Sequence, residues 1–283
     1  MERISLKGAG IEIAADAAGP ADGPLVIFIP GSGQTRQSWG KALAEAGARG
    51  FRAIAMDLRG HGDSQWSPDG RYELDIFADD LRALIGELDR APMVVGASLG
   101  GLTAMKVAGN PPFPVRALVL VDVTPRVEME GANEVVAFME SGQDGFASID
   151  EAAEAVSAYL PHRQRPKSNA GLARNLRLRE DGRYYWHYDP AFLRMGDKAK
   201  ENAGAPNPFE ASARALTIPV LLIKGGRSRI VTNEGAREFL EMVPHADFVD
   251  IDGAHHMVAG DANDAFNEAV FAFLEREAAK TAA

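Results

Sequence analysis

The stretch Met93-Val94-Val95-Gly96-Ala97-Ser98-Leu99-Gly100-Gly101 decides the fold of this chain. An apolar strand pattern ends here at a G-x-S-x-G motif, and a helix-forming stretch, residues 102–107, begins immediately after it. A serine at so sharp a strand-to-helix turn adopts strained backbone angles that lift its hydroxyl clear of the sheet, and the glycines leave room for the turn. The free amides of the new helix point toward charge that develops beside that hydroxyl. The motif therefore predicts that Ser98 is a nucleophile.

Strand and helix patterns alternate along most of the 283 residues. Period-two alternation predicts an antiparallel edge hairpin from residues 3–7 and 11–17. Apolar runs predict buried strands at 25–29, 53–56, 93–95, 117–121, 220–223 and 248–251. Amphipathic patterns predict helices at 38–48, 74–88, 102–108, 233–242 and 263–277, the last with Asp261 as its N-cap. This order predicts an α/β fold with a mostly parallel eight-stranded sheet, helices on both faces and sites at the carboxyl ends of the strands.

The strand, motif and helix together resemble the nucleophile elbow of the α/β-hydrolase family. The loop after the fourth strand, Asp57-Leu58-Arg59-Gly60-His61-Gly62-Asp63-Ser64, also resembles the family pattern. The resemblance implies a core domain from residues 1–124 and 217–283. It implies an inserted helical cap at 125–216, where no buried strand pattern is found and where helices are predicted at 133–139, 149–160 and 169–178. We interpret the 57–64 loop as architecture, with Asp57 accepting backbone hydrogen bonds, and not as a metal site.

A serine hydroxyl needs a base to take its proton, and this base is usually an imidazole oriented by a buried carboxylate. The family order is serine, then acid, then histidine. Of six histidines only His255 and His256 follow the last predicted strand. The family pattern of a small residue, a histidine and an apolar residue aligns best on His256, so His256 is the predicted base and His255 the alternative.

The family usually takes the acid from a G-x-x-D pattern after the seventh strand, but this chain has Arg229 at the corresponding position. A cation cannot accept the imidazole N–H. Some family members take the acid from the end of the sixth strand, where this chain has Asp122. A strand-end aspartate can also be a simple turn former, and Glu234, five residues past Arg229, is a weaker rival. The predicted triad is Ser98, His256 and Asp122.

The tetrahedral intermediate needs donors for its oxyanion. The resemblance implies the backbone N–H of Leu99 as the first donor. The second is the N–H of Ser32, in a glycine-rich turn after the third strand in which Pro30 replaces the family's usual histidine. The substrate pocket is expected between the sheet and the cap. Its predicted residues are Gly31, Trp39, Met129, Tyr159 and Trp186, and the aromatic run at 184–188 either walls the substrate or forms the cap's own core.

The composition of the chain excludes several kinds of chemistry and of binding partner. The absence of cysteine excludes disulfides and thiolate nucleophiles, and a net charge of −10 argues against nucleic acid or an anionic membrane as a partner. Without an apolar leader pattern or a run long enough to cross a bilayer, a cytoplasmic location is expected. We predict no metal or cofactor, and a monomer or homodimer.

The predicted function is a serine hydrolase that cleaves a small-molecule carboxylic ester or lactone through an acyl-enzyme. Two alternatives stay open. One is C–C bond hydrolysis or cofactor-free perhydrolysis on the same triad. The other is a small-molecule receptor with little turnover, a reading that Arg229 keeps open.

Overall fold

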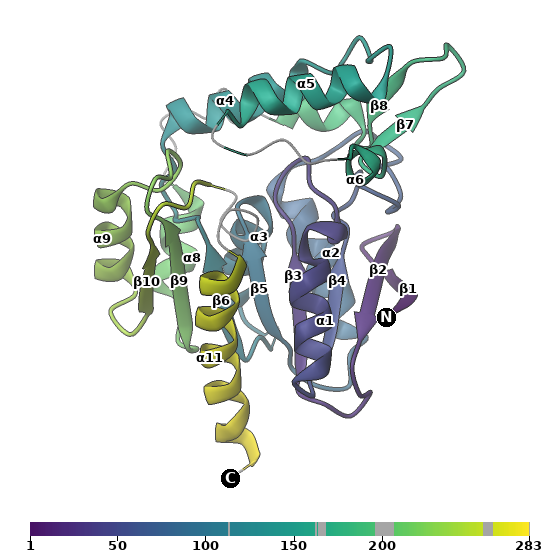
Figure 1. Ribbon diagram of the computed structural model, residues 1–283. Helices are drawn as coiled ribbons and strands as arrows, with labels where there is room; N and C mark the ends of the chain where they lie inside the picture. The colour runs from purple at the N-terminus through teal and green to yellow at the C-terminus, as the bar shows by residue number, and fades with distance from the viewer. Residues whose placement is uncertain (113, 162, 164–167, 196–206, 257–262, 283) are drawn as a thin grey trace.

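The computed structural model describes the chain except residues 113, 162, 164–167, 196–206, 257–262 and 283. Its strands are β1 (Glu2–Lys7), β2 (Glu12–Ala18), β3 (Leu25–Ile29), β4 (Arg52–Met56), β5 (Met93–Ala97), β6 (Ala117–Val121), β9 (Val220–Gly225) and β10 (Asp247–Ile251). They form one eight-stranded sheet in the order β1-β2-β4-β3-β5-β6-β9-β10 (Figure 1). β2 pairs antiparallel with β1 and β4, and the remaining neighbours pair in parallel. The predicted mostly parallel sheet with an antiparallel edge hairpin is confirmed.

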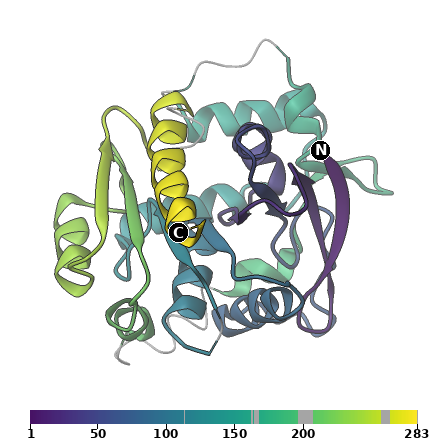
Figure 2. The ribbon, with the colours of Figure 1, turned by 90° about the horizontal axis from the view of Figure 1, so that it is seen from below.

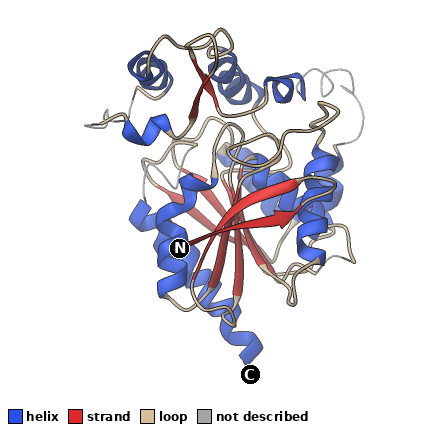
Figure 3. Ribbon diagram, turned by 90° about the vertical axis from the view of Figure 1, so that its right-hand side faces the viewer, coloured by secondary structure: helices blue, strands red, loops and turns tan. Residues whose placement is uncertain are grey.

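Helices cover both faces of the sheet, as predicted (Figure 2, Figure 3). One face carries α1 (Gly40–Ala48), preceded by the short helix η1 (Arg36–Trp39), and α11 (Asn263–Ala282). The other carries α2 (Leu74–Gly86), α3 (Leu99–Ala108), α8 (Pro208–Arg214) and α9 (Asn233–Met242). Asp261, the predicted N-cap of the last helix, lies outside the described residues. None of the described helices is long and apolar enough to cross a membrane.

Strand β3 shows how the sheet serves two cores. All five of its side chains are buried. Val26 and Phe28 pack in the cluster with α1 and α11, whereas Ile27 and Ile29 pack in the cluster with α2 and α3. Because side chains alternate between faces, a strand covered on both sides is apolar at every position. This explains the uninterrupted apolar run in the sequence.

Six elements between β6 and β9 lie over the carboxyl end of the sheet, and we call them the cap elements (Figure 1, Figure 3). They are α4 (Met129–Glu140), α5 (Ile149–Tyr159), α6 (Ala170–Ala173), β7 (Leu176–Leu178), β8 (Tyr184–Trp186) and η2 (Pro190–Arg194). The Ser148 hydroxyl accepts a hydrogen bond from the Glu151 amide and so caps the start of α5. Helix α8, which falls in the predicted cap range 125–216, packs instead against α3 and α9.

The predicted cap helix at 169–178 is wrong. Only residues 170–173 are helical, and Leu176 lies opposite Trp186 in an antiparallel hairpin of β7 and β8. Asp181-Gly182 lies between the two strands, and Gly182 has a φ of 77°. An Asp-Gly pair between two strand-forming segments is a strong hairpin signal. The apolar residues at 169–178 are spaced as in a helix, but the turn and the pairing of β7 with β8 give a hairpin instead.

Candidate active site

Ser98 lies at the turn between β5 and α3. Its φ of 47° and ψ of −117° are angles that side chains rarely adopt, at a cost of about 1–3 kcal/mol. The neighbouring glycines are sterically required. A Cβ on Gly96 would lie 2.6 Å from the carbonyl oxygen of Gly100, and a Cβ on Gly100 would lie 2.5 Å from that of Ile29. The turn therefore holds Ser98 at the carboxyl edge of the sheet, directly before the first amides of α3.

Asp122 follows β6, the strand beside β5, and is fully buried. Its Oδ1 accepts a hydrogen bond from the Gly225 amide at 2.9 Å. Its Oδ2 accepts one from the Ser228 hydroxyl at 2.5 Å and one from Nδ1 of His256 at 2.7 Å. Because Nδ1 carries the hydrogen in this arrangement, the lone pair of His256 Nε2 is available as a base.

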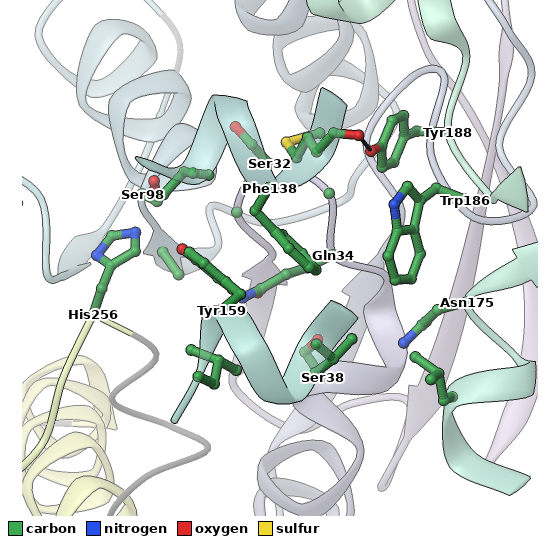
Figure 4. Close-up of a pocket in the computed structure, with 18 of the residues that line it drawn as sticks. Ser32, Gln34, Ser38, Ser98, Phe138, Tyr159, Asn175, Trp186, Tyr188 and His256 are labelled. Atoms are coloured by element: carbon green, nitrogen blue, oxygen red, sulfur yellow. Dashed lines mark hydrogen bonds between the residues drawn. The ribbon is translucent and has the colours of Figure 1, made fainter. Parts of the chain in front are cut away.

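Ser98 and His256 line the same cavity, and the imidazole faces the serine side chain (Figure 4). Within the described residues no hydrogen bond joins them. Such bonds are often long or poorly aligned before substrate binds, and rotation about the serine Cα–Cβ bond redirects its Oγ. Of the described lining residues only His256 is a histidine, so His255 is not one of them. Glu234, the rival acid, pairs with Arg237 on the exposed side of α9.

The turn at residues 31–34 packs against the predicted nucleophile. A Cβ built on Gly31 would lie 3.2 Å from the Cβ of Ser98. The amide of Gln34 donates to the carbonyl oxygen of Gly31 at 3.2 Å, and Gly33 has a φ of 70°. A β-turn with positive φ at its third residue favours glycine there. We call this segment the oxyanion turn.

The two predicted oxyanion donors lie near Ser98, the predicted nucleophile. Leu99 is the first residue of α3, where backbone amides lack an intrahelical acceptor. Ser32 is the second residue of the oxyanion turn and lines the cavity. No backbone or side-chain acceptor for the Ser32 amide is found among the described residues. Both amides are therefore free to donate to a substrate oxygen.

The cavity has a volume of about 360 Å³ and lies between the carboxyl edge of the sheet and the cap elements. Four predicted pocket residues line it: Gly31, Trp39, Tyr159 and Trp186. Met129 does not belong to the lining, which corrects the prediction. It is 61% exposed at the first turn of α4. Phe138 follows it by nine positions, and two and a half helical turns place the two on opposite sides of α4.

Helices α4 and α5 supply an apolar wall, of which only Tyr159 was predicted from the sequence. It consists of Val135, Phe138 and Met139 from α4 and Val156, Tyr159 and Leu160 from the α5 segment. The rings of Phe138 and Tyr159 stack with their centroids 4.3 Å apart. The Tyr159 hydroxyl points toward the end of the cavity that holds Ser98 and His256 (Figure 4). The i, i+3, i+4 spacing in α4 was the available signal for this wall.

The residues of the aromatic run at 184–188 have different surroundings. Trp186 and Tyr188 line the cavity. Tyr185 instead stacks under the Arg179 guanidinium, 4.0 Å from ring centroid to the charged carbon, and donates its hydroxyl hydrogen to Asp181. His187 is buried between the cap and the core.

The model of the alpha/beta hydrolase family matches residues 26–269. The chain belongs to this family. Esterase Rv0045c of Mycobacterium tuberculosis is 33% identical over 259 residues, which cover 89% of this chain and 83% of that protein. A solved structure of that esterase has a TM-score of 0.76 at 30% identity, covering 97% of this chain and 92% of the other.

A second relative of this alpha/beta hydrolase is 2-(acetamidomethylene)succinate hydrolase of Mesorhizobium japonicum. It is 30% identical over 240 residues, 83% of this chain and 82% of that protein. A crystal structure of an E-2-(acetamidomethylene)succinate hydrolase has a TM-score of 0.85 at 24% identity and covers 97% of this chain and all of the other. The named relatives are esterases and hydrolases, and this chain is a hydrolase of the same family.

Arg229, at the position where the hydrolase family usually carries its acid, points to the cap. Its guanidinium pairs with Glu130 and Glu134 of α4, each at 2.6 Å. Ser228, one residue earlier, faces inward. Its hydroxyl donates to Asp122 and accepts the amide hydrogen of Ile230 at 3.1 Å. The loop that usually supplies the acid thus supplies a hydrogen-bond donor to an acid from the neighbouring strand.

The 57–64 loop packs beneath the oxyanion turn. Asp57 is buried and accepts the backbone N–H groups of Arg36 at 2.6 Å and Asp63 at 2.9 Å, as the sequence predicted. Burial raises the pKa of Asp57, while these hydrogen bonds and the Arg36 guanidinium oppose the rise. His61 is also buried, its Nδ1 lies 2.9 Å from the carbonyl oxygen of Arg59, and burial lowers its pKa to about 4. No cluster of three or more potential metal ligands is found in the described part of the chain.

Proposed function

We propose that this hydrolase cleaves small carboxylic esters or lactones through an acyl-enzyme on Ser98. The observation that carries the proposal is the 2.7 Å hydrogen bond from His256 Nδ1 to the buried carboxylate of Asp122, with Ser98 in the same cavity. A carboxylate, an imidazole and a serine in this order are what nucleophilic acyl transfer requires. The esterase among the relatives supports the same reaction class.

In the first half of the reaction, Oγ of Ser98 bonds to the substrate carbonyl carbon while His256 Nε2 takes the hydroxyl hydrogen. The carbonyl oxygen becomes an oxyanion and accepts hydrogen bonds from the amides of Leu99 and Ser32, each worth about 3–4 kcal/mol. The imidazolium then gives its hydrogen to the leaving oxygen as the C–O bond breaks. With a lactone, the new alcohol stays attached to the acyl group.

In the second half, His256 takes a hydrogen from water, and the resulting hydroxide bonds to the acyl carbon. The second tetrahedral intermediate uses the same two amides. When it collapses, the bond to Ser98 breaks, the serine regains its hydrogen from His256, and the carboxylic acid leaves. Asp122 stabilises the imidazolium in both halves of the reaction.

The cavity supports a small, mainly apolar substrate. Its volume of about 360 Å³ lies at the lower end of the range for small-molecule sites. Phe138, Trp186 and Leu172 supply apolar wall, Gln34 and Asn175 supply neutral polar groups, and Arg163 supplies a cation. This composition fits a mainly apolar acyl group.

C–C hydrolysis and perhydrolysis would use the same residues, so a substrate panel separates them from ester cleavage. The receptor alternative depended on Arg229 blocking the acid position. Since Arg229 pairs with α4 and Asp122 contacts His256, that argument is lost. The cytoplasmic location, the monomeric or homodimeric state and the lack of a cofactor stay predictions from the sequence.

The test combines a fluorophosphonate probe with p-nitrophenyl esters of increasing acyl length. We expect the probe to label Ser98, as located by peptide mass spectrometry, and the esters to turn over. The Ser98→Ala variant should show neither. A folded wild-type protein that neither reacts with the probe nor turns over any ester or lactone would reject the proposal.

A further inference from the structure

His187 connects the cap elements to two loops of the core. It directly follows β8, and only 1% of its surface is exposed. Its Nδ1 accepts the backbone N–H of Gly62 at 2.7 Å, and its Nε2 lies 3.1 Å from the carbonyl oxygen of Gly33 in the oxyanion turn. Its own amide donates to the carbonyl oxygen of Asn175 at 3.0 Å. A cap side chain therefore contacts the backbone of the turn that carries a predicted oxyanion donor.

The two partners determine which ring nitrogen carries the hydrogen. A backbone N–H can only donate, so Nδ1 of His187 must be the unprotonated acceptor. The neutral ring then has its hydrogen on Nε2, which donates to the carbonyl oxygen of Gly33. Burial, together with the nearby ring of His61, lowers the pKa of His187 to about 3. The ring is therefore neutral at ordinary pH and holds both bonds at once.

The contact restrains one peptide plane of the oxyanion turn from both sides. The peptide between Gly33 and Gln34 has its carbonyl oxygen held by His187 and its N–H held by the carbonyl oxygen of Gly31. A peptide unit is planar, so fixing both of its polar groups fixes the plane. The Ser32 amide lies two peptides earlier in the same tight turn. It shares a peptide plane with the Gly31 carbonyl that accepts the Gln34 N–H, so it takes its direction from this anchor.

The core holds the other end of the same segment. Asp57 accepts the amide hydrogen of Arg36, two residues after the turn, at 2.6 Å. The segment from Gly31 to Arg36 is therefore held by a core aspartate on one side and by a cap histidine on the other. Removing the His187 contact leaves the Gly33–Gln34 peptide held only through its N–H.

We propose that His187 is a positioning residue, which holds the Gly33 carbonyl so that the Ser32 amide points at the reacting carbonyl oxygen. The inference rests on the proposed function, because it assigns His187 to the oxyanion site of that reaction. An oxyanion donor acts mainly in the transition state, so a misdirected donor lowers kcat more than it raises KM. Correct seating of the cap then controls the chemical step as well as substrate binding.

Two amide variants separate the two bonds of the ring. In His187→Asn the side-chain oxygen replaces Nδ1 and keeps the acceptor for Gly62, but no group reaches Gly33. In His187→Gln the longer side chain brings an amide donor to the place of Nε2. We expect the Asn variant to lose about tenfold or more in kcat with little change in KM, as for partial loss of an oxyanion donor. The Gln variant should recover most of that loss.

Each kcat is divided by the fraction of protein whose Ser98 the fluorophosphonate labels. Unfolded protein is not labelled and therefore does not lower the value. An unchanged kcat per labelled site in the Asn variant, with only a lower yield of folded protein, would overturn the proposal. So would equal kcat values for the Asn and Gln variants when both are reduced. Failure of the proposed function is distinct, because the wild type itself would then show neither labelling nor turnover.

A cavity variant covers the case in which the Asn variant does not fold. In His187→Gly, added imidazole can occupy the vacated space, accept from Gly62 and donate to Gly33. Added 1-methylimidazole can accept but has no hydrogen to donate. After correction for ester hydrolysis by the free bases, we expect imidazole to raise kcat and 1-methylimidazole not to. Equal rescue by the two bases, or rescue by neither, would overturn the proposal.

Discussion

Ser98 and Asp122, which follow the neighbouring strands β5 and β6, have nearly the same φ, 47° and 49°. Every other positive-φ residue in the described part of the chain is a glycine. Each of the two sits where a parallel strand ends and the chain turns away, so each side chain leaves the sheet at its carboxyl edge. The strain costs about 1–3 kcal/mol per residue, and it persists where the surrounding contacts hold the backbone in that conformation. Two strained strand ends thus bring the proposed nucleophile and the proposed acid to the same edge of the sheet.

Asp122→Asn should lower kcat by about 10⁴, because an amide cannot stabilise the imidazolium and favours the wrong tautomer of His256. Steady-state kinetics on a p-nitrophenyl ester measure the loss, and circular dichroism checks that the fold is retained. Glu234→Gln is the matched control and should leave kcat unchanged, since Glu234 pairs with Arg237 at the surface. A near-wild-type rate in Asp122→Asn would reject Asp122 as the acid.

Ser228→Ala should reduce kcat by about tenfold and the free energy of unfolding by about 1–3 kcal/mol. The hydroxyl donates to the charged Asp122 and accepts the amide hydrogens of Ile230 and Val231, so its removal leaves buried polar groups without a partner. Urea unfolding and steady-state kinetics test the two effects separately. A variant as stable and as active as the wild type would show that Ser228 does not hold the acid.

Arg229→Met should leave kcat unchanged and stability within about 1 kcal/mol, because its ion pairs with Glu130 and Glu134 are largely exposed. A double-mutant cycle with Glu134→Gln measures the coupling between the two side chains. The coupling should weaken as salt is raised. A loss of kcat comparable to that of Asp122→Asn would instead give Arg229 a role in the chemistry.

Stability should fall with acid because His61 is buried as a neutral ring, its pKa lowered by burial from 6.5 to about 4. Between these values the unfolded chain binds a proton that the folded chain excludes, so the free energy of unfolding rises with pH. The contribution of His61 to the free energy of unfolding is complete above about pH 6.5. It falls by about 3 kcal/mol as the pH is lowered to 4. Urea unfolding across this range should show a shallower pH slope in His61→Gln. Identical slopes in the two proteins would contradict the prediction.

Phe138→Ala should widen the apolar end of the cavity and raise the kcat/KM ratio of long-chain over short-chain esters by about fourfold for each methylene that enters the new space. The lost ring stacks on Tyr159 and lines the cavity, so its removal leaves space for about three or four methylene groups, each worth about 0.8 kcal/mol when buried. Met129→Ala, on the opposite side of the same helix and exposed, is the matched control and should not change the ratio. An equal shift in both variants would show that the acyl chain does not reach Phe138.

Local patterns were sufficient for the sheet and for the strained turn at Ser98. Continuous apolar runs predict strands buried on both faces, and the glycines around Ser98 predict the elbow, because steric requirements act over a few residues. The hairpin of β7 and β8 was missed although Asp181-Gly182 indicates it, since helical and strand patterns compete in so short a segment. Met129 was misplaced because which side of α4 faces the cavity depends on its packing.

The order of residues is enough to predict a strained turn at Ser98 and to nominate Asp122, His255, His256 and Glu234 as its partners. The folded chain favours two of them, because it places His256 against Asp122 and turns Arg229 toward α4. The contacts of Ser228 with Asp122 and of His187 with Gly33 were also found only in the folded structure. A hydrogen bond depends on the distance and direction between two groups. The spacing of residues along the sequence gives neither that distance nor that direction.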